Sequence, residues 1–418
     1  MKVLIYAHDF APSVGGVETA VMLLARGLAG EVSARTGEPI AVTVVAQTAA
    51  GSFRDEELAF RVVRRPGAGQ LWGLMRQAEV VHLAGPAFLP LILGLVQGKK
   101  MVVEHHGYQA ACPNGRFLYQ PTKTACPGHF LARNYGECLR CNAAESGGWK
   151  SLKMLLLTFP RRWMCKRVER NVTVSDHVAE RIELPRQQTI YHGLEDVAGE
   201  DVAARGVGRE SVCIGYAGRL VAEKGLGVLL EAARRLAEQR YEFRLKLIGD
   251  GPERGRLEER ARELRLEGRV EFTGFLGGEA LKRALGEVDV MVMPTLMEET
   301  AGLVVMDEMR KGKAVVVSDI GGMSEVVGPA GLKFPAGDAE GLAGCLRRVL
   351  EEPGLAEELG ARARQRCAEM FRRERMIEEH REVYEELRNA AGRAAGVAVA
   401  TPGVARGSEA EENSYRLK

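Results

Sequence analysis

The stretch Pro294-Thr295-Leu296-Met297-Glu298-Glu299-Thr300-Ala301-Gly302-Leu303-Val304-Val305-Met306-Asp307-Glu308 decides how the fold of this chain is interpreted. It follows the apolar run 290–293, which is typical of a buried strand that ends at Pro294. Gly302 opens a predicted helix, whose first N–H groups lack partners and whose positive dipole end attracts anions. Gly302 and Leu303 are therefore predicted to bind an anion, with Glu299 just before the helix and Asp307 about 7–8 Å along it. Two carboxylates beside a phosphate site suit a sugar nucleotide, and an ordinary solvated helix start is the alternative.

Length and composition indicate a two-domain globular protein. The 418 residues exceed the size of one ordinary core, and 46% of them are apolar. A net charge of +2 gives no indication of nucleic-acid binding. The chain enters a core strand at Lys2 without a signal peptide, and no run of about 18 apolar residues predicts a transmembrane helix. Eight cysteines then indicate reduced thiols or a metal site, and the cytoplasm is the expected compartment.

Apolar runs alternate with helical patterns along most of the chain, which predicts an α/β fold with two parallel-sheet domains facing each other across a cleft. The first domain is expected over 1–195 and the second over 196–375, with a soft break at 196–210. A helix at 376–390 is expected to cross back to the first domain, and the tail 391–418 is expected to be disordered. Strands are predicted at 2–7, 40–46, 60–64, 79–84, 100–104, 171–175 and 189–192, and then at 211–217, 243–248, 269–273, 289–293, 314–318 and 331–334.

Loops with unusual chemistry follow several of these strands, and ligands bind at the carboxyl ends of parallel strands. Gly15 and Gly16 follow strand 2–7, and glycines before a helix let the backbone approach a ligand closely. His106 follows strand 100–104 and could act on a hydroxyl. Arg219 and Lys224 follow strand 211–217 and can grip one anion together. An ordinary turn, a surface histidine and a solvated basic pair are the plainer readings of these three loops.

The order of these motifs resembles the retaining nucleotide-sugar glycosyltransferases of family 4, which have the GT-B fold. The resemblance covers residue 1 to about 388. The motifs are Gly-Gly-Val-Glu (15–18), His-Gly (106–107), Gly-Arg-Leu-x3-Lys-Gly (218–225), Gly-Asp-Gly-Pro (249–252), Phe-Thr-Gly (272–274), the stretch around Glu299 and Gly-Gly-Met-Ser-Glu-Val-Val (321–327). The family moves a sugar from a nucleotide donor in the second domain to an acceptor hydroxyl in the first, usually without a catalytic metal.

The resemblance also implies a role for each matching residue. Glu299, His106, Arg219 and Lys224 would be catalytic, the two cations holding the diphosphate and Glu299 the donor sugar. Asp307 would contact the ribose, and Phe275 would lie near the base. The substrate-binding set implied by the resemblance is Gly15, Gly16, Phe275, Gly302, Leu303 and Asp307. A nucleotide sugar and a sugar or lipid-linked acceptor are thus the expected partners, and no cofactor is expected in catalysis.

Three positions depart from the family pattern. Asp307 stands where the family has a second Glu, Ala301 where an aromatic residue is common, and His192 where Asn is frequent. Asp is shorter than Glu by one methylene, so the ribose contact is expected to be weaker or shifted. A sugar-nucleotide-binding module inactivated by the Asp307 change is therefore one alternative. A sugar-nucleotide epimerase on the same fold is another, whereas a phosphorylase would normally need a pyridoxal lysine site, for which the sequence gives no signal. The base, the sugar, the acceptor and the oligomeric state are not indicated by the sequence.

Four cysteines fall within 30 residues of an expected insertion at about 108–145, namely Cys112, Cys126, Cys138 and Cys141. A Cys-x2-Cys pair with two further cysteines can hold tetrahedral zinc, and the insertion has few apolar residues of its own. A structural zinc site is the prediction. An iron–sulfur cluster and unliganded thiols are the alternatives.

The segment 150–170 combines apolar residues with seven Lys and Arg residues. A basic amphipathic stretch of this kind can rest on an anionic membrane. A helix packed on the domain with a solvated basic face is the alternative.

Overall fold

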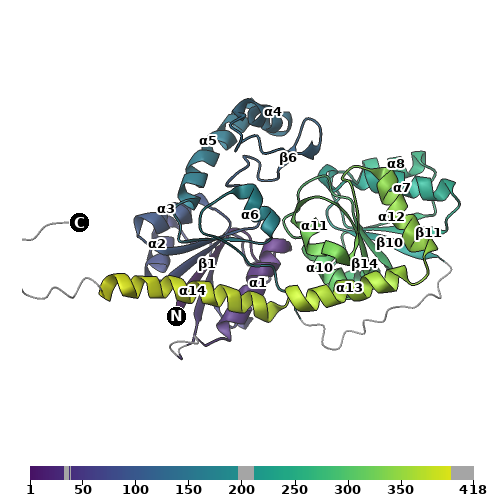
Figure 1. Ribbon diagram of the computed structural model, residues 1–418. Coiled ribbons are helices and arrows are strands. Elements are labelled where there is room, and N and C mark those ends of the chain that lie inside the picture. Colours follow the sequence, from purple (N-terminus) through teal and green to yellow (C-terminus); the bar gives the residue numbers. More distant parts are fainter. Residues whose placement is uncertain (33–36, 38, 196–210, 397–418) are drawn as a thin grey trace, which may run out of the picture.

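Continuous apolar runs form the strands of two parallel sheets, and helices flank each sheet (Figure 1). The structure is a computed structural model that describes residues 1–32, 37, 39–195 and 211–396. Strands buried on both faces need such runs, which is why the pattern could be recognised. The predicted α/β class with two facing sheets is confirmed.

The first sheet has seven parallel strands, with β4 at its centre between β1 and β5. Its order is β3 (Arg61–Arg64), β2 (Ala41–Ala46), β1 (Lys2–Ala7), β4 (Val80–Ala84), β5 (Lys100–His105), β8 (Arg170–Thr173) and β9 (Gln187–Thr189). Its helical segments are α1 (Gly16–Ala29), η1 (Asp55–Glu57), α2 (Ala68–Gln77), α3 (Phe88–Val96) and α6 (Asp176–Ile182).

The second sheet has six parallel strands and includes the apolar run before Pro294. Its order is β12 (Val270–Gly274), β11 (Phe243–Ile248), β10 (Val212–Ala217), β13 (Val290–Met293), β14 (Ala314–Ser318) and β15 (Leu332–Phe334). The helical segments are η2 (Ala222–Lys224), α7 (Leu226–Glu238), α8 (Arg254–Glu263), α9 (Gly278–Gly286), α10 (Leu303–Arg310), α11 (Gly321–Val327), η3 (Gly328–Ala330), α12 (Ala339–Glu351) and α13 (Leu355–Met370).

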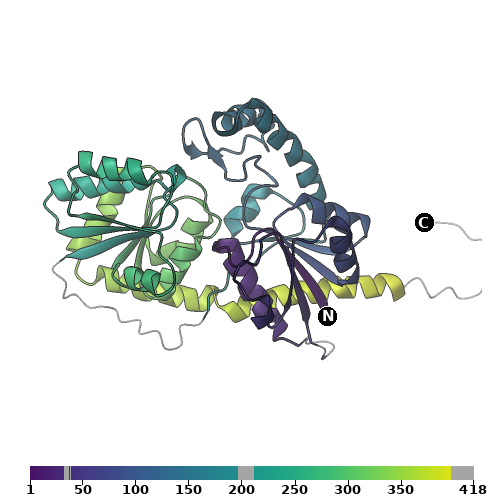
Figure 2. The same cartoon turned by 180° about the vertical axis from the view of Figure 1, so that it is seen from behind.

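A small lobe rises from the first domain after β5 and leans toward the second domain (Figure 2). It contains the hairpin β6 (Leu118–Tyr119) and β7 (Thr124–Ala125), and then α4 (Tyr135–Ser146) and α5 (Gly148–Cys165). The hairpin was not predicted, because strands of two residues leave no periodic pattern in the sequence.

The long helix α14 (Arg373–Gly396) runs from the second domain along the first (Figure 1). Its start lies beside Leu194, near the point where the chain leaves the first domain. The Leu194 N–H donates to the Phe371 carbonyl at 2.9 Å. Gly193 is needed there, since a Cβ on it would lie 2.6 Å from the Arg373 Cα. The helix begins three residues before the expected 376 and continues to Gly396, so the expectation of disorder is wrong for 391–396. The segments 196–210 and 397–418 lie outside the described residues.

Candidate functional site

Helix α10 begins at the carboxyl edge of the second sheet, one residue later than expected. Gly302 precedes it as the N-cap with φ of +80°, a left-handed conformation that favours glycine. Leu303 is the first helical residue, and no side chain caps this helix start. Its first N–H groups are therefore available to an anion, as the sequence predicts.

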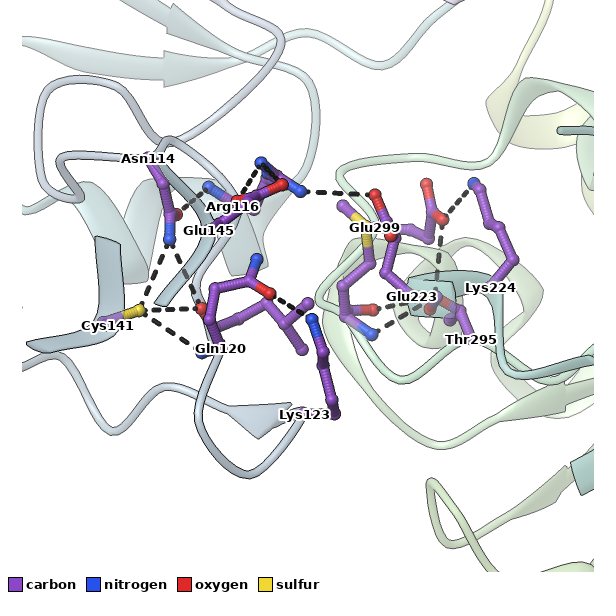
Figure 3. A network of polar contacts seen from close by, with 12 residues as sticks. Asn114, Arg116, Gln120, Lys123, Cys141, Glu145, Glu223, Lys224, Thr295 and Glu299 are labelled. Atoms are coloured by element: carbon purple, nitrogen blue, oxygen red, sulfur yellow. Dashed lines mark hydrogen bonds and ion pairs between the residues drawn. The ribbon is translucent and has the colours of Figure 1, made fainter. Parts of the chain in front are cut away.

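Lys224 and Glu299 form the polar centre of this edge (Figure 3). The Lys224 ammonium pairs directly with the Glu299 carboxylate, and both side chains are about one-sixth exposed. Thr295 Oγ1 lies 3.4 Å from the same carboxylate and 3.2 Å from the Glu223 carbonyl. Two loops that are 75 residues apart in sequence are thus joined, with a cation and a carboxylate side by side.

Arg219 is exposed at the end of β10, five residues before Lys224. Its carbonyl accepts from the buried Tyr216 hydroxyl at 2.8 Å, which fixes the backbone of this loop. Among the residues that the structure describes, the Arg219 guanidinium has no hydrogen-bond or ion-pair partner. It is therefore free to bind an anion.

Gly15 and Gly16 face this edge from the first domain. A Cβ on Gly16 would lie 3.3 Å from Leu303 Cδ1, so the two predicted glycine motifs touch across the domain boundary. A cleft of about 350 Å³ lies beside this contact, lined by Ser13 and Glu18 from the first domain and by Leu303, Asp307 and Arg310 from the second.

Asp307 opens onto the cleft but is neutralised within its own helix. Its two oxygens pair with Arg310 and Lys311, each at 2.6 Å. Burial opposes ionisation of Asp307, but these cations outweigh it and lower its pKa. The neighbouring Glu308 is fully buried and pairs with Lys311 and Lys313, so it has a structural role and does not replace the family's second Glu.

His106 lies at the carboxyl end of the first sheet, above the buried carboxylate of Glu104. Its Nε2 is 3.2 Å from Glu104 Oε2, and its ring stacks on His192 with 5.2 Å between centroids. Its carbonyl accepts from Thr300 Oγ1 at 3.3 Å, next to Glu299 in sequence. The catalytic candidates of both domains therefore share one boundary.

Glu104 collects further histidines from distant parts of the chain. His82 Nε2 lies 3.1 Å away, and the His82 Nδ1 accepts from the Tyr384 hydroxyl of α14 at 2.8 Å. Burial alone would raise the pKa of Glu104, but His106, His380 and His82 hold it well below the ordinary range. Glu104 belongs to two groups of side chains whose potential metal-ligand atoms lie within 4.8 Å of one another. One group is Glu104 with His82 and His380, and the other is Glu104 with His106 and His192. Both ring nitrogens of His82 already have partners, so hydrogen bonds account for the first group.

His192→Asn is expected to make the protein less sensitive to acid. Burial and the neighbouring His106 lower the pKa of His192 to about 3, below the ordinary 6.5. The unfolded chain therefore takes up a proton that the folded state excludes, and stability falls as the pH drops below 6.5. The loss is about 1.4 kcal/mol per pH unit, or about 2 kcal/mol by pH 5.

Urea unfolding at pH 7 and pH 5 checks this expectation. The loss of unfolding free energy between the two pH values should be about 2 kcal/mol smaller in His192→Asn than in the wild type. The exposed His8 is the control site, and His8→Asn should keep the wild-type loss. An unchanged loss in His192→Asn would contradict the assignment.

Glu298 and Glu325 bind the first domain and were missed as site residues. Glu298 Oε2 accepts from Arg181 Nε at 2.8 Å and lies 3.0 Å from His177 Nε2. Glu325 accepts from the N–H groups of Asp176 and His177 at 2.9 and 2.7 Å, at the start of α6. These carboxylates hold the two domains together beside the Glu299 loop. Glu325 lies in the Gly-Gly-Met-Ser-Glu motif, which was the available signal.

The lobe reaches the same loop through Arg116 (Figure 3). This guanidinium pairs with Glu145 of the lobe at 2.8 Å and with Glu223 of the second domain at 3.3 Å. Glu223 directly precedes Lys224, so the lobe borders the polar centre. A larger cavity of about 690 Å³ lies between Lys123 of the lobe, the start of α7 and the length of α8.

The four lobe cysteines, Cys112, Cys126, Cys138 and Cys141, are all buried and free of disulfides. The Gln120 N–H donates to Cys141 Sγ at 3.3 Å. Burial raises the pKa of Cys112 to about 11 and that of Cys138 to about 12. Among the described residues, the potential metal ligands that lie within 4.8 Å of one another in groups of three or more are the two groups around Glu104. The four cysteine sulfurs do not form such a group.

Phe275 follows the Gly274 turn at the end of β12 and is 74% exposed. No described side chain stacks on it. The structure thus places it at the end of β12, the edge strand of the second sheet.

The segment that carries Arg219, Lys224, Glu299 and α10 is similar to a known family. Residues 200–366 match the family model for glycosyl transferases group 1. This match lies in the second domain. This domain contains five of the motifs on which the predicted resemblance depends, and the first domain supplies the other two.

Curated glycosyltransferases are similar to parts of this chain. A 2-deoxystreptamine glucosyltransferase from Streptomyces kanamyceticus is 31% identical over 222 residues, which cover 48% of this chain and 57% of that protein. An alpha-D-kanosaminyltransferase from the same organism is 28% identical over 290 residues, covering 66% of this chain and 68% of its own. The chain thus spans little more than half the length of the first of these relatives.

Solved structures confirm the GT-B fold. Anabaena HepE in complex with UDP has a TM-score of 0.68 at 16% identity, covering 92% of this chain and 100% of its own. A sucrose-phosphate synthase from Thermosynechococcus elongatus also has a TM-score of 0.68, at 19% identity, covering 93% and 99% of the two chains. At such identities the similarity concerns the fold alone.

Proposed function

We propose that this chain transfers a sugar from a nucleoside-diphosphate sugar to an acceptor hydroxyl, with retention of anomeric configuration. The observation that carries the proposal is the Lys224–Glu299 pair beside the uncapped start of α10. At this edge of the sheet, a cation and helix N–H groups can bind a diphosphate, and the neighbouring carboxylate can bind a sugar.

The chemistry that these residues would supply is mainly electrostatic. As the bond between the sugar and the diphosphate breaks, negative charge accumulates on the leaving diphosphate. Arg219, Lys224 and the N–H groups at the start of α10 would stabilise that charge where it develops. Glu299 would accept hydrogen bonds from the sugar hydroxyls, and His106 would lie near the transferred sugar. In this scheme catalysis needs no metal ion, as in family 4.

The proposal also names the class of the donor, a nucleotide sugar, and that of the acceptor, a sugar or lipid-linked molecule. Solved structures of HepE contain UDP and UDP-glucose, which supports a nucleotide-sugar donor here. The first domain would receive a sugar or lipid-linked acceptor. A thermal-shift screen with UDP-, GDP- and ADP-sugars should raise the unfolding temperature with at least one of them, because ligand binding stabilises the native state.

A transfer assay with wild type and Glu299→Ala tests the function. The wild type should release nucleoside diphosphate and form a glycoside with the donor's anomeric configuration, and Glu299→Ala should lose at least 100-fold in rate. An inactive wild type that still binds the donor would favour a sugar-nucleotide-binding module. Conversion of the donor sugar without transfer would favour an epimerase.

The cysteine lobe stays a predicted structural zinc site within this proposal. Cys112, Cys126, Cys138 and Cys141 supply four buried thiols, the donor types that suit tetrahedral zinc. No three of their sulfurs lie within 4.8 Å of one another, so zinc binding would have to draw the lobe's loops together. Elemental analysis of the purified protein should give one zinc per chain, and a Cys138→Ser/Cys141→Ser variant should lose it. Far less than one zinc per wild-type chain would remove the site.

A further inference from the structure

Helix α5 exposes an apolar stripe on its outer surface. Trp149, Leu156 and Trp163 are 82%, 57% and 52% exposed, and Leu152 and Phe159 are also exposed. Spacings of three and four residues place these side chains on one face of the helix. The residues buried against the domain, including Ser151, Leu155 and Thr158, lie on another face. Phe159 also packs on the rings of Phe130 and Tyr135, and the rest of the stripe is additional to the face that packs.

Helix α3 extends the apolar surface. Leu89, Ile92 and Val96 are exposed at helical spacing, with Val96 at 69%. The two helices pack together, and the Arg161 guanidinium of α5 lies 4.5 Å from the centre of the Phe88 ring. In both views α3 and α5 lie on the side of the first domain turned away from the second (Figures 1 and 2). Eight large apolar side chains therefore form one outward surface, the α3–α5 face, comprising Leu89, Ile92, Val96, Trp149, Leu152, Leu156, Phe159 and Trp163.

The charged side chains within these two helices are all positive. Neither 88–96 nor 148–165 contains an acidic residue. Lys150, Lys153 and Lys166 are exposed, and Arg167 stacks on Trp163 at 3.6 Å. Arg162 is not part of this set, because it binds the carbonyls of Ile182 and Glu183. The face therefore offers apolar contact and positive charge to one partner.

We propose that the α3–α5 face docks on an anionic lipid bilayer. Soluble proteins seldom expose so large an apolar patch without a partner for it. Tryptophan rings prefer the bilayer interface, lysines attract anionic headgroups, and apolar side chains enter the acyl boundary. A second copy of this chain would bring two acid-free basic faces together, which repel each other. Among the described residues no helix is both long and apolar enough to cross a membrane, so contact along the surface is the geometry that fits.

Vesicle flotation with the full chain tests the proposal independently of sugar transfer. Phosphatidylcholine vesicles are compared with vesicles that contain phosphatidylglycerol as well. The wild type should float with the anionic vesicles and at least tenfold less with the neutral ones. Leu156→Glu/Trp163→Glu and Leu89→Glu/Ile92→Glu should each reduce binding at least tenfold, because both helices belong to the face. Lys150→Glu/Lys153→Glu should reduce binding to anionic vesicles and remove its salt sensitivity.

Controls separate this face from general charge and from folding. Lys282→Glu/Arg283→Glu changes the same charge on α9 of the second domain and should bind vesicles like the wild type. Circular dichroism and unfolding temperature should be unchanged in every variant, because the altered side chains are exposed. The proposal is overturned if the wild type binds no vesicles, or if the α3 and α5 variants bind as well as it does. It is also overturned if those variants instead dissociate a dimer in size-exclusion chromatography with light scattering.

Discussion

Lys224→Ala is expected to lower the rate of sugar transfer about 10²- to 10³-fold, the range for losing one preorganised group that stabilises developing charge. The Lys224 ammonium is held against Glu299, one-sixth exposed, and its position does not depend on a bound ligand. Its attraction for the diphosphate grows as the sugar leaves, so the loss should fall mainly on kcat. Steady-state kinetics with the donor identified by thermal shift measure the effect.

Lys282→Ala provides the matched control for this prediction. Lys282 is an exposed lysine of α9 that pairs only with Glu279 among the described residues. Its removal should leave kcat and KM unchanged. A Lys224→Ala rate within threefold of the wild type would show that this ammonium does not stabilise the leaving group.

Gly225→Ala is expected to reduce both stability and transfer. Gly225 has φ of +69°, which costs an ordinary residue about 1–2 kcal/mol. A Cβ there would lie 1.9 Å from the Pro294 carbonyl oxygen, and a backbone atom cannot move aside by changing rotamer. The loop must shift, which carries Lys224 away from Glu299. We expect a loss of about 3 kcal/mol of unfolding free energy and at least 100-fold in transfer rate.

Gly227→Ala, two residues further along, is the control. A Cβ on Gly227 would meet no atom within 4 Å, and the residue lies in the first turn of α7. This variant should be as stable as the wild type or slightly more so, because alanine favours the helix. Chemical denaturation and the transfer assay compare the two variants. Equal behaviour of Gly225→Ala and Gly227→Ala would contradict the described packing of this loop.

Much of the scaffold could be predicted because buried parallel strands consist of unbroken apolar runs. Strands 2–7 and 243–248 were predicted with the bounds of β1 and β11. The start of α10 was predicted within one residue, since Gly302 follows a strand that Pro294 ends. The juxtaposition of Gly16 with Leu303 followed from the rule that strand ends gather at one edge of each sheet.

Contacts between distant elements could not be predicted in the same way. His82 and Tyr384 are 302 residues apart, and their hydrogen bond depends on where α14 crosses the first domain. Glu298 and Glu299 are adjacent and chemically alike, yet one binds Arg181 of the first domain and the other Lys224 of the second. Their directions depend on loop backbone geometry, which local sequence patterns do not encode. The pairing of Asp307 with Arg310 and Lys311 follows helix spacing and could have been anticipated.

Calorimetric titration of UDP, GDP and ADP into the wild type and an Arg219→Ala/Lys224→Ala variant tests the central claim most directly. The claim is that these two cations and the start of α10 bind a diphosphate at the edge of the second domain. At least one nucleotide should bind the wild type, and the double variant should bind it at least 100-fold more weakly, because each charge-assisted contact contributes about 1.5–3 kcal/mol. Binding of that nucleotide with equal affinity to both proteins, or of none of the three to the wild type, would contradict the account.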